Sequence, residues 1–314
     1  MKNSYLCLTQ KKCFYTSSLI FPREVSVGFV VFLFLLSLND LRGQADTSSI
    51  EKVAAIKVES NASKNTVYRT HILEHGLIGA AGATLTYFGI RKQNRRNDIS
   101  VERVFALNRT QVNSFDRGAI NQDLSKLSIS KRRSDIYMVS SIGLVSALGL
   151  DKRVQKEWKG VLALYFESLG VSSTAQAWTA ISTDRFRPIT YMTGVDTSLR
   201  VDRRNYNSFY SGHTSATATA SFFAAKVYSD MHPELGRKKW LVFAAATIPP
   251  ALVGINRIKA GKHFYSDVIL GGVLGATAGV LIPHLHKNKN RTITYSPQIS
   301  SGYVGLNLLY KIGQ

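Results

Sequence analysis

The sequence predicts an all-α protein, a helical bundle followed by a short C-terminal β-hairpin. Six apolar segments rich in small residues recur between residues 72 and 284, and charged or Gly/Pro residues separate them. The last residues instead alternate at period two, as in "YVGLNLLYKI", which is typical of a strand. A hydrophobic content of 45% against 19% charged residues, over 314 positions, fits a folded globular chain.

The N-terminal segment has the features of an export signal. Basic residues precede the apolar run "VGFVVFLFLLSL" at 27–38, and small residues follow it. We expect residues 1–45 to be a signal peptide or, alternatively, an uncleaved anchor. Either reading predicts an exported protein of the periplasm or cell envelope. Cys7 and Cys13 both precede the apolar run, so cleavage would leave a chain without disulfides.

The remaining elements follow in order along the chain. A polar lead-in at 46–71 precedes the predicted helical domain at 72–286, and the hairpin tail is expected at 287–314. The tail would pair "RTITYSP" with "YVGLNLLYKI" across "QISSG". We expect about six to eight helices. The apolar segments lie at 72–90, 136–150, 160–182, 215–229, 240–255 and 267–284.

The apolar segments are short for membrane spans. Most uninterrupted apolar stretches reach about 14 to 16 residues, whereas a span needs about 20. They also carry Glu74, His75 and Glu167, and the mean hydropathy is −0.04. The pattern therefore favours a soluble or peripherally attached bundle over an integral one.

The charge balance indicates an anionic partner. Forty Lys and Arg against twenty Asp and Glu give a formal charge of +20. Such a balance is typical of proteins that meet nucleic acid, a phospholipid surface or a phosphorylated substrate. The sequence has no zinc-finger spacing, no aromatic RNA-binding run and no basic helix with heptads, so we expect no nucleic acid. A solvated basic surface without a specific ligand is the alternative.

Three short blocks carry the chemistry, each at the mouth of an apolar helix. The first, "TDRFRPIT", places Arg185 and Arg187 before a proline, and guanidinium groups suit a tetrahedral oxyanion. The second, "SFYSGHTS", places His213 at a helix start. There Ser211 or Thr214 can cap the helix, and the backbone N–H groups favour an anion.

The third block, "NRIKAGKHFYSDVILGG", contains Arg257, His263 and Asp267. Residues four apart share a helix face, so Asp267 could bind one imidazole nitrogen of His263. A histidine held in this way has a fixed tautomer and a more nucleophilic second nitrogen. Each block alone has an ordinary structural reading, and only the combination of the three indicates a phosphate site.

In this order, "RP", "SGH" and "R-x5-H-x3-D" resemble the type 2 phosphatidic acid phosphatase (PAP2) superfamily, which includes bacterial acid phosphatases and vanadium haloperoxidases. The resemblance implies an all-helical phosphatase that acts on phosphomonoesters, lipid phosphates or pyrophosphates without a metal or cofactor. It implies His263 as the nucleophile, oriented by Asp267, and His213 as the acid. The phosphate-binding groups would be Arg187, Arg257, Ser211 and the backbone N–H of Gly212.

The sequence departs from the family pattern in the first block. The family has a lysine seven residues before the arginine of "RP", and here that position is Ala180. We expect Arg185 to compensate as a further phosphate-binding cation. The change leaves open a non-catalytic protein that binds anions or lipid phosphates in the envelope. A vanadium haloperoxidase is a further alternative, although that class keeps the lysine.

Overall fold

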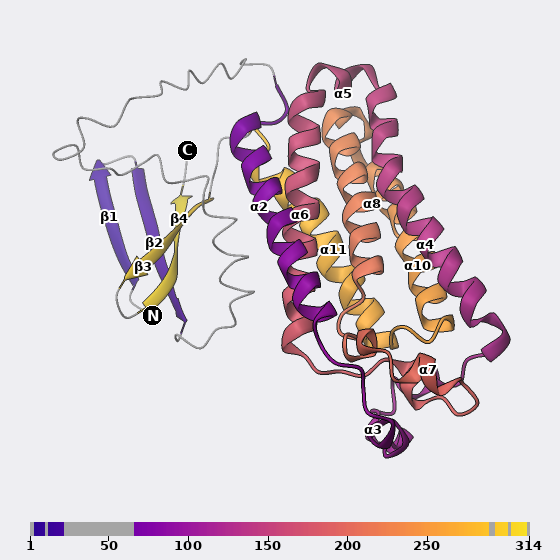
Figure 1. The fold of residues 1–314 in the computed structure, drawn as a ribbon. Helices are drawn as coiled ribbons and strands as arrows, with labels where there is room; N and C mark the ends of the chain where they lie inside the picture. Colours follow the sequence, from indigo (N-terminus) through magenta and orange to yellow (C-terminus); the bar gives the residue numbers. More distant parts are fainter. Residues whose placement is uncertain (1–2, 10–11, 22–65, 289–292, 301–302, 313–314) are drawn as a thin grey trace. The chain divides into compact units, whose positions relative to one another are not determined.

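The computed structural model describes residues 3–9, 12–21, 66–288, 293–300 and 303–312. Its helical unit extends to Lys287 and is a bundle of long helices that lie side by side (Figure 1). These helices are α2 (Ile72–Asn94), α4 (Leu127–Leu144), α6 (Trp158–Ser182), α8 (Gly212–Met231), α10 (Ile248–Lys259) and α11 (Tyr265–Leu285).

Shorter helices connect the bundle. They are α3 (Val101–Phe105), α5 (Lys152–Lys156), α7 (Thr197–Arg200) and α9 (Lys239–Ala246). Figure 1 shows α3 and α7 at one end of the bundle and α5 at the other. Single 3₁₀ turns complete the connections: η1 (Arg109–Gln111), η2 (Arg117–Ile120), η3 (Leu124–Lys126), η4 (Val145–Leu150), η5 (Pro188–Tyr191), η6 (Arg203–Tyr206) and η7 (Pro233–Lys238).

A second unit consists of four antiparallel strands in the order β1-β2-β4-β3. Their bounds are β1 (Asn3–Thr9), β2 (Lys12–Phe21), β3 (Ile293–Ser300) and β4 (Tyr303–Ile312). The hairpin that we expect at 287–314 stays a prediction, as do the domain limits. The apolar run at 27–38 and most of the lead-in, residues 46–65, lie outside the described residues.

Small residues let the central helices approach closely. A Cβ atom added to Gly275 of α11 would lie 2.2 Å from the Ser215 carbonyl oxygen of α8. A Cβ atom on Gly82 of α2 would lie 2.8 Å from the Gly170 backbone of α6. Because no side chain can fit at such distances, these glycines set the spacing of the α8–α11 and α2–α6 pairs. The starts of α8 and α11, which carry the second and third blocks, are thereby held together.

The expected all-α bundle is confirmed for the helical unit, with two differences in its elements. Helix α4 begins at Leu127, nine residues before the apolar segment, and includes the charged "KRRSD". The segment at 240–255 is divided into α9 and α10, and α10 has proline in its first turn. Proline is tolerated there because the first N–H groups of a helix have no partner within it.

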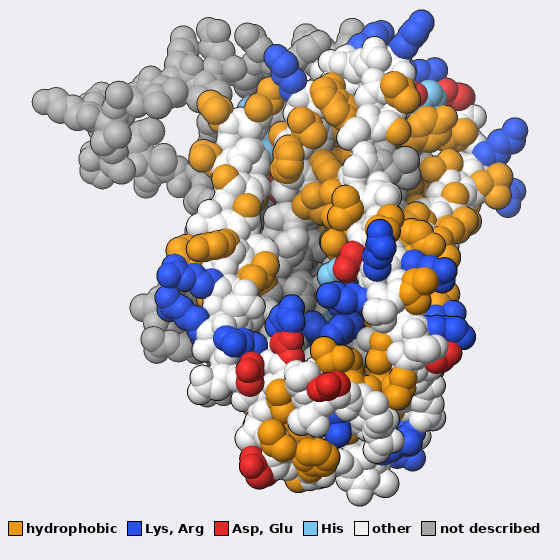
Figure 2. Space-filling view, turned by 45° about the vertical axis from the view of Figure 1, so that its right-hand side comes forward, with side chains coloured by type: hydrophobic (Ala, Val, Ile, Leu, Met, Phe, Trp, Pro, Cys, Tyr) orange, Lys and Arg blue, Asp and Glu red, His pale blue; other side chains and the backbone are white. Residues whose placement is uncertain are grey.

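Large apolar side chains cover part of the outside of the bundle. On α2, Leu73 and Leu77 are 78% and 71% exposed, and on α9 Trp240 and Leu241 are 67% and 70% exposed. Such side chains spread over much of the face shown in Figure 2. Two segments of the described chain, Pro233–Lys259 and Tyr265–Leu285, are long and apolar enough to cross a membrane, and only 33% of each apolar window is buried.

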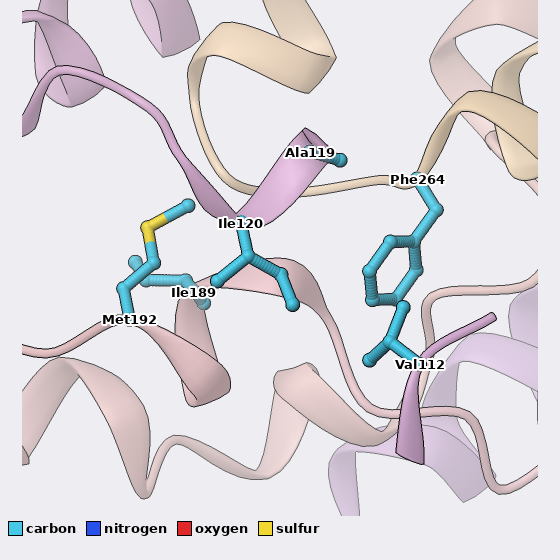
Figure 3. Close-up of a cluster of buried hydrophobic side chains, with 6 residues drawn as sticks. All are labelled: Val112, Ala119, Ile120, Ile189, Met192 and Phe264. Atoms are coloured by element: carbon cyan, nitrogen blue, oxygen red, sulfur yellow. The ribbon is translucent and has the colours of Figure 1, made fainter. Parts of the chain in front are cut away.

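A small hydrophobic cluster fixes the connections at the end of the bundle that carries the motifs. It unites Val112, Ala119 and Ile120, from the connection between α3 and α4, with Ile189 of η5, with Met192 directly after η5, and with Phe264 (Figure 3). Phe264 directly follows His263, and Ile189 follows the "RP" pair by one residue. The cluster therefore ties the first block to the third.

Candidate active site

Two arginines of the motifs, the buried Arg257 and the partly buried Arg187, are neutralised little by carboxylates of the described chain. Arg257, in the last turn of α10, is 4% exposed, and its Nη1 lies 3.5 Å from both Ser134 Oγ and Asp135 Oδ1. Arg187 precedes η5, and no carboxylate in the described chain lies within ion-pair distance of it. The Nε atoms of Arg187 and Arg257 are both buried and have no hydrogen-bond partner among the described residues.

This arrangement is electrostatically costly without an anion. Burial, followed by the positive charge of Arg257, lowers the pKa of Arg187 to about 9. A buried guanidinium whose N–H groups are unpaired loses the hydrogen bonds that it would make in water. Figure 2 shows Lys and Arg side chains gathered, with a histidine and an acidic side chain, around a hollow on this face. A bound oxyanion would satisfy both guanidinium groups.

His263 is held in one tautomer by a backbone carbonyl. Its Nδ1 lies 2.7 Å from the Ser208 carbonyl oxygen, so Nδ1–H donates and Nε2 keeps its lone pair. Burial, and then the positive charges of Arg257 and Arg187, lower the pKa of His263 well below its usual value. The imidazole is therefore neutral at neutral pH, which is the state that a nucleophilic histidine needs.

Asp267 lies near His263, but the expected direct hydrogen bond is replaced. The closest approach, Nδ1 to Oδ2, is 4.0 Å. Asp267 Oδ2 instead accepts from Ser208 Oγ at 2.6 Å and from the Phe264 N–H at 2.9 Å. Asp267 is the third residue of α11, and its carboxylate caps the start of that helix. Its link to His263 is indirect, because Ser208 bonds to both residues. Ser208 lies in the second block, but its carbonyl role has no side-chain signature in the sequence.

His213 lies in the first turn of α8 and has a partner that the motifs did not predict. Its Nε2 lies 2.9 Å from Oδ1 of Asp135, a residue of α4 whose side chain is 42% exposed. The same oxygen is the one 3.5 Å from Arg257 Nη1. Asp135 thus occupies the space between an arginine and the histidine where the motifs place a substrate phosphoryl group. The sequence offered only the charged run "SKRRSD" as a signal.

Arg185 is placed differently from the expectation that it binds phosphate. Its Nη1 donates to Asp267 Oδ1 at 2.5 Å, and its Nη2 donates to Asp116 Oδ2 at 2.6 Å. Asp116 is fully buried and also accepts from the N–H and Oγ of Ser266. These contacts favour a role for Arg185 in fixing Asp267, because two carboxylates already neutralise its guanidinium.

Ser211 and Gly212 form the start of α8, as the sequence predicted for a helix mouth. Ser211 is the N-cap residue, it is fully buried, and its hydroxyl bonds with that of Thr214. Gly212 is the first helical residue. The hydroxyl of Ser211 is therefore committed to the cap, whereas helix N-terminal N–H groups are the type of donor that binds anions.

Lys262 is the cation that the sequence analysis missed. It directly precedes His263 in the third block, and its N–H donates to the Arg257 carbonyl oxygen at 3.0 Å. Burial, and then the positive charges of Arg187 and Arg257, lower the pKa of Lys262 to about 7. Position 180, where the family has lysine, is filled by a fully buried alanine of α6.

Comparisons with known proteins agree with the motifs. Residues 161–291, which include all three blocks, match the model of the PAP2 superfamily. Two curated relatives are the decaprenylphosphoryl-5-phosphoribose phosphatases of Mycobacterium tuberculosis strains CDC 1551 / Oshkosh and ATCC 25618 / H37Rv. Each is 29% identical over 94 residues, which are 30% of this chain and 46% of the relative. The chain thus spans less than half the length of these relatives.

Among solved structures, the fold is similar to that of a transmembrane PAP2 type phosphatidylglycerolphosphate phosphatase from Bacillus subtilis. The match covers 65% of this chain and 94% of that one, at 20% identity and a TM-score of 0.42. The family similarity therefore depends on the sequence matches and on the motif residues that they span. On these grounds the chain is similar to the PAP2 superfamily over residues 161–291.

Proposed function

We propose that this protein is a metal-independent phosphatase that releases phosphate from a lipid phosphate, pyrophosphate or phosphomonoester through a phosphohistidine. One observation carries the proposal: the buried Arg257 and the partly buried Arg187 both have a buried Nε–H group without a partner among the described residues, and the charges of both lower the pKa of the neutral His263. Guanidinium groups with unpaired N–H donors fit the oxygens of a phosphoryl group, which spread their negative charge in the transition state.

In the proposed reaction, the free Nε2 of His263 attacks phosphorus while the Ser208 carbonyl holds Nδ1–H. The bond from phosphorus to the leaving oxygen breaks, and His213 donates its proton to that oxygen. Water then attacks phosphorus, the bond from phosphorus to Nε2 of His263 breaks, neutral His213 accepts a proton from this water, and inorganic phosphate leaves. The arginines supply the positive charge that stabilises both transition states.

Lys262 has a specific role in this proposal. Position 180, where the family has a lysine, is alanine here, and we propose that Lys262 supplies the missing positive charge. The third cation of the site then comes from the third block instead of the first. The contacts of Arg185 support this assignment, because its guanidinium is already bound by Asp116 and Asp267. We accordingly assign Arg185 to positioning and Lys262 to phosphate binding.

We propose that the substrate is a membrane lipid phosphate and that α9–α10 and α11 cross the membrane. A core helix of a soluble protein would be mostly buried, whereas these two segments are 33% buried and the bundle exposes large apolar side chains. The names of the mycobacterial relatives also indicate polyprenyl-linked substrates. This replaces the soluble or peripheral bundle that the lengths of the apolar segments favoured. Export to the cell envelope remains part of the proposal.

The test is phosphate release by the full chain in detergent, with chelator present. The substrates are an aryl phosphate, phosphatidate and a polyprenyl pyrophosphate. We expect the lipid substrates to be preferred and His263→Ala to abolish turnover, because the attacking nitrogen is removed. His232→Ala is the matched control, since His232 lies at the far end of α8 and contacts the carboxylates of Asp151 and Glu234. Equal turnover by His263→Ala and the unaltered protein would exclude the mechanism.

A second function has one observation in its favour. Asp135 lies between His213 and Arg257, and the family lysine is absent. The site therefore resembles one that binds an anion without catalysing a reaction. In that case, the purified protein would bind vanadate, which Arg187→Ala would abolish, and would release no phosphate from any of the three substrates. Turnover that depends on His263 would exclude this alternative.

A further inference from the structure

A second cluster of ionisable side chains lies at the other end of the bundle from the phosphate site. His75 is in the first turn of α2, Glu167 is in α6, and His286 is the C-cap of α11. Helix α11 begins beside the phosphate site and has 21 residues, so His286 is roughly 30 Å from that site along its axis. The catalytic proposal does not use any of these three residues.

The cluster is buried and tightly built. His75 and Glu167 are each 1% exposed and His286 is 5% exposed. His75 Nδ1 lies 2.7 Å from Glu167 Oε2, and His286 Nε2 lies 3.6 Å from Glu167 Oε1. The two imidazole rings meet edge to face, with centroids 4.5 Å apart. Three potential ligands from three helices therefore converge in the protein interior.

One nitrogen of the cluster has no hydrogen-bond partner. Nδ1 of His75 lies 2.7 Å from Oε2 of Glu167, and the other ring nitrogen, Nε2, is buried with no partner among the described residues. An unpaired buried imidazole nitrogen costs free energy, so such atoms are rare in folded proteins. The atom of His75 that faces Glu167 is Nδ1, so an ion shared by these two residues would replace the proton between them and bind Nδ1.

We propose that His75, Glu167 and His286 bind a divalent transition-metal ion of the zinc class. Two histidines and one glutamate are a known three-ligand set for zinc, with water in the fourth position. One ligand atom from each residue lies within 4.8 Å of the others. Ligands bound to zinc at about 2.0–2.1 Å stand roughly 3.3 Å apart, so the most widely separated ligand atoms would close by up to about 1.5 Å on binding. The ion would also neutralise the buried carboxylate.

The position of the site gives it a structural role. It joins the start of α2 to α6 and to the end of α11. Next to it, the Tyr68 N–H and the Val67 N–H both bond to Glu157, and the Arg69 N–H bonds to the His286 carbonyl oxygen. An ion held by ligands from three helices would fasten this end of the bundle, because metal binding and folding are coupled. The phosphate site is separate and needs no metal in the proposed mechanism.

The test uses the full chain in detergent, stripped with chelator and then titrated with Zn²⁺ or Co²⁺ alone. We expect one ion per chain, a higher melting temperature with Zn²⁺, and visible Co²⁺ bands of tetrahedral intensity. His75→Gln should weaken binding at least tenfold. His232→Gln is the matched control, since His232 also contacts two carboxylates at this end. His263→Ala should also keep the ion.

Two results would overturn the proposal. One is the absence of any bound ion and of any melting shift at micromolar Zn²⁺ in the unaltered protein. The other is an affinity that His75→Gln leaves unchanged. If His75→Gln does not fold, the melting shift and the Co²⁺ spectrum of the unaltered chain decide the question, because tetrahedral bands require a protein site. Neither readout depends on phosphatase activity.

Discussion

Replacing Lys262 by methionine tests whether this residue supplies the missing family cation. Methionine keeps much of the length and apolar character of the side chain and removes the charge. A hydrogen bond from a charged group is worth about 1.5–3 kcal/mol, so kcat/KM should fall by roughly 10- to 150-fold. Lys259→Met is the matched control, because Lys259 ends α10 three residues earlier, is exposed, and should leave the rate unchanged.

The pH dependence gives a second measurement on the same residue. The pKa of Lys262 is lowered to about 7 by burial and by the charges of Arg187, Arg257 and Lys131, against which Asp202 acts weakly. The ammonium group is therefore protonated below pH 7 and loses its charge as the pH rises. We expect kcat/KM of the unaltered enzyme to decline above about pH 7 and this decline to be absent in Lys262→Met.

The assay is initial phosphate release from an aryl phosphate between pH 5.5 and 9, in the same detergent for every variant. Ionisation of the substrate affects all variants equally, so only the difference between their profiles is interpreted. Lys262→Arg should keep the charge at high pH and flatten the decline. The reasoning fails if Lys262→Met lowers kcat/KM by less than about threefold, or if its profile keeps the alkaline decline.

Two further predictions concern binding and stability. Asp135→Asn removes a carboxylate from the arginine site, and about 1 kcal/mol of lost repulsion should tighten vanadate binding roughly fivefold; unchanged or weaker binding, measured by inhibition, would contradict this. Gly275→Ala places a methyl group 2.2 Å from an α8 carbonyl oxygen and should destabilise the bundle by about 1–3 kcal/mol or more. Gly272→Ala, where the added Cβ meets its nearest side-chain atom at 3.8 Å, is the control, and equal melting temperatures for the two variants would refute the argument.

The helical fold was predictable because its signal is local. Segments of small and apolar residues that are bounded by charged residues indicate helices from the local sequence alone. The observed helices α6, α8 and α11 closely follow the predicted segments. The start of α4 was not predictable, because its first turns are charged and pack through few apolar residues. Exposure of apolar side chains is a property of the assembled bundle, so the segment lengths alone could not supply the observation on which we propose membrane spans.

The site was predictable where its residues stand in motifs and unpredictable where they come from elsewhere. His213, Arg257 and His263 lie in short blocks whose spacing carries a signal. Asp135 reaches the site from α4, some 80 residues away in sequence from its partner His213, and nothing in "SKRRSD" distinguishes it from a surface carboxylate. The Ser208 carbonyl is backbone, so its role depends on the loop conformation and not on residue type.

The two arginines of the first block show why a motif and a role are separate inferences. Arg185 and Arg187 are two residues apart and chemically identical, and either could bind phosphate on sequence grounds. In the folded chain, Arg185 lies between Asp116 and Asp267, whereas Arg187 has a buried Nε–H without a partner in the described chain. A guanidinium already bound by two carboxylates gains little from a phosphate, and an unsatisfied one gains the full hydrogen bond. We therefore propose phosphate binding for Arg187 and positioning of Asp267 for Arg185, because their donor groups differ in whether they already have partners, although their positions in the motif are alike.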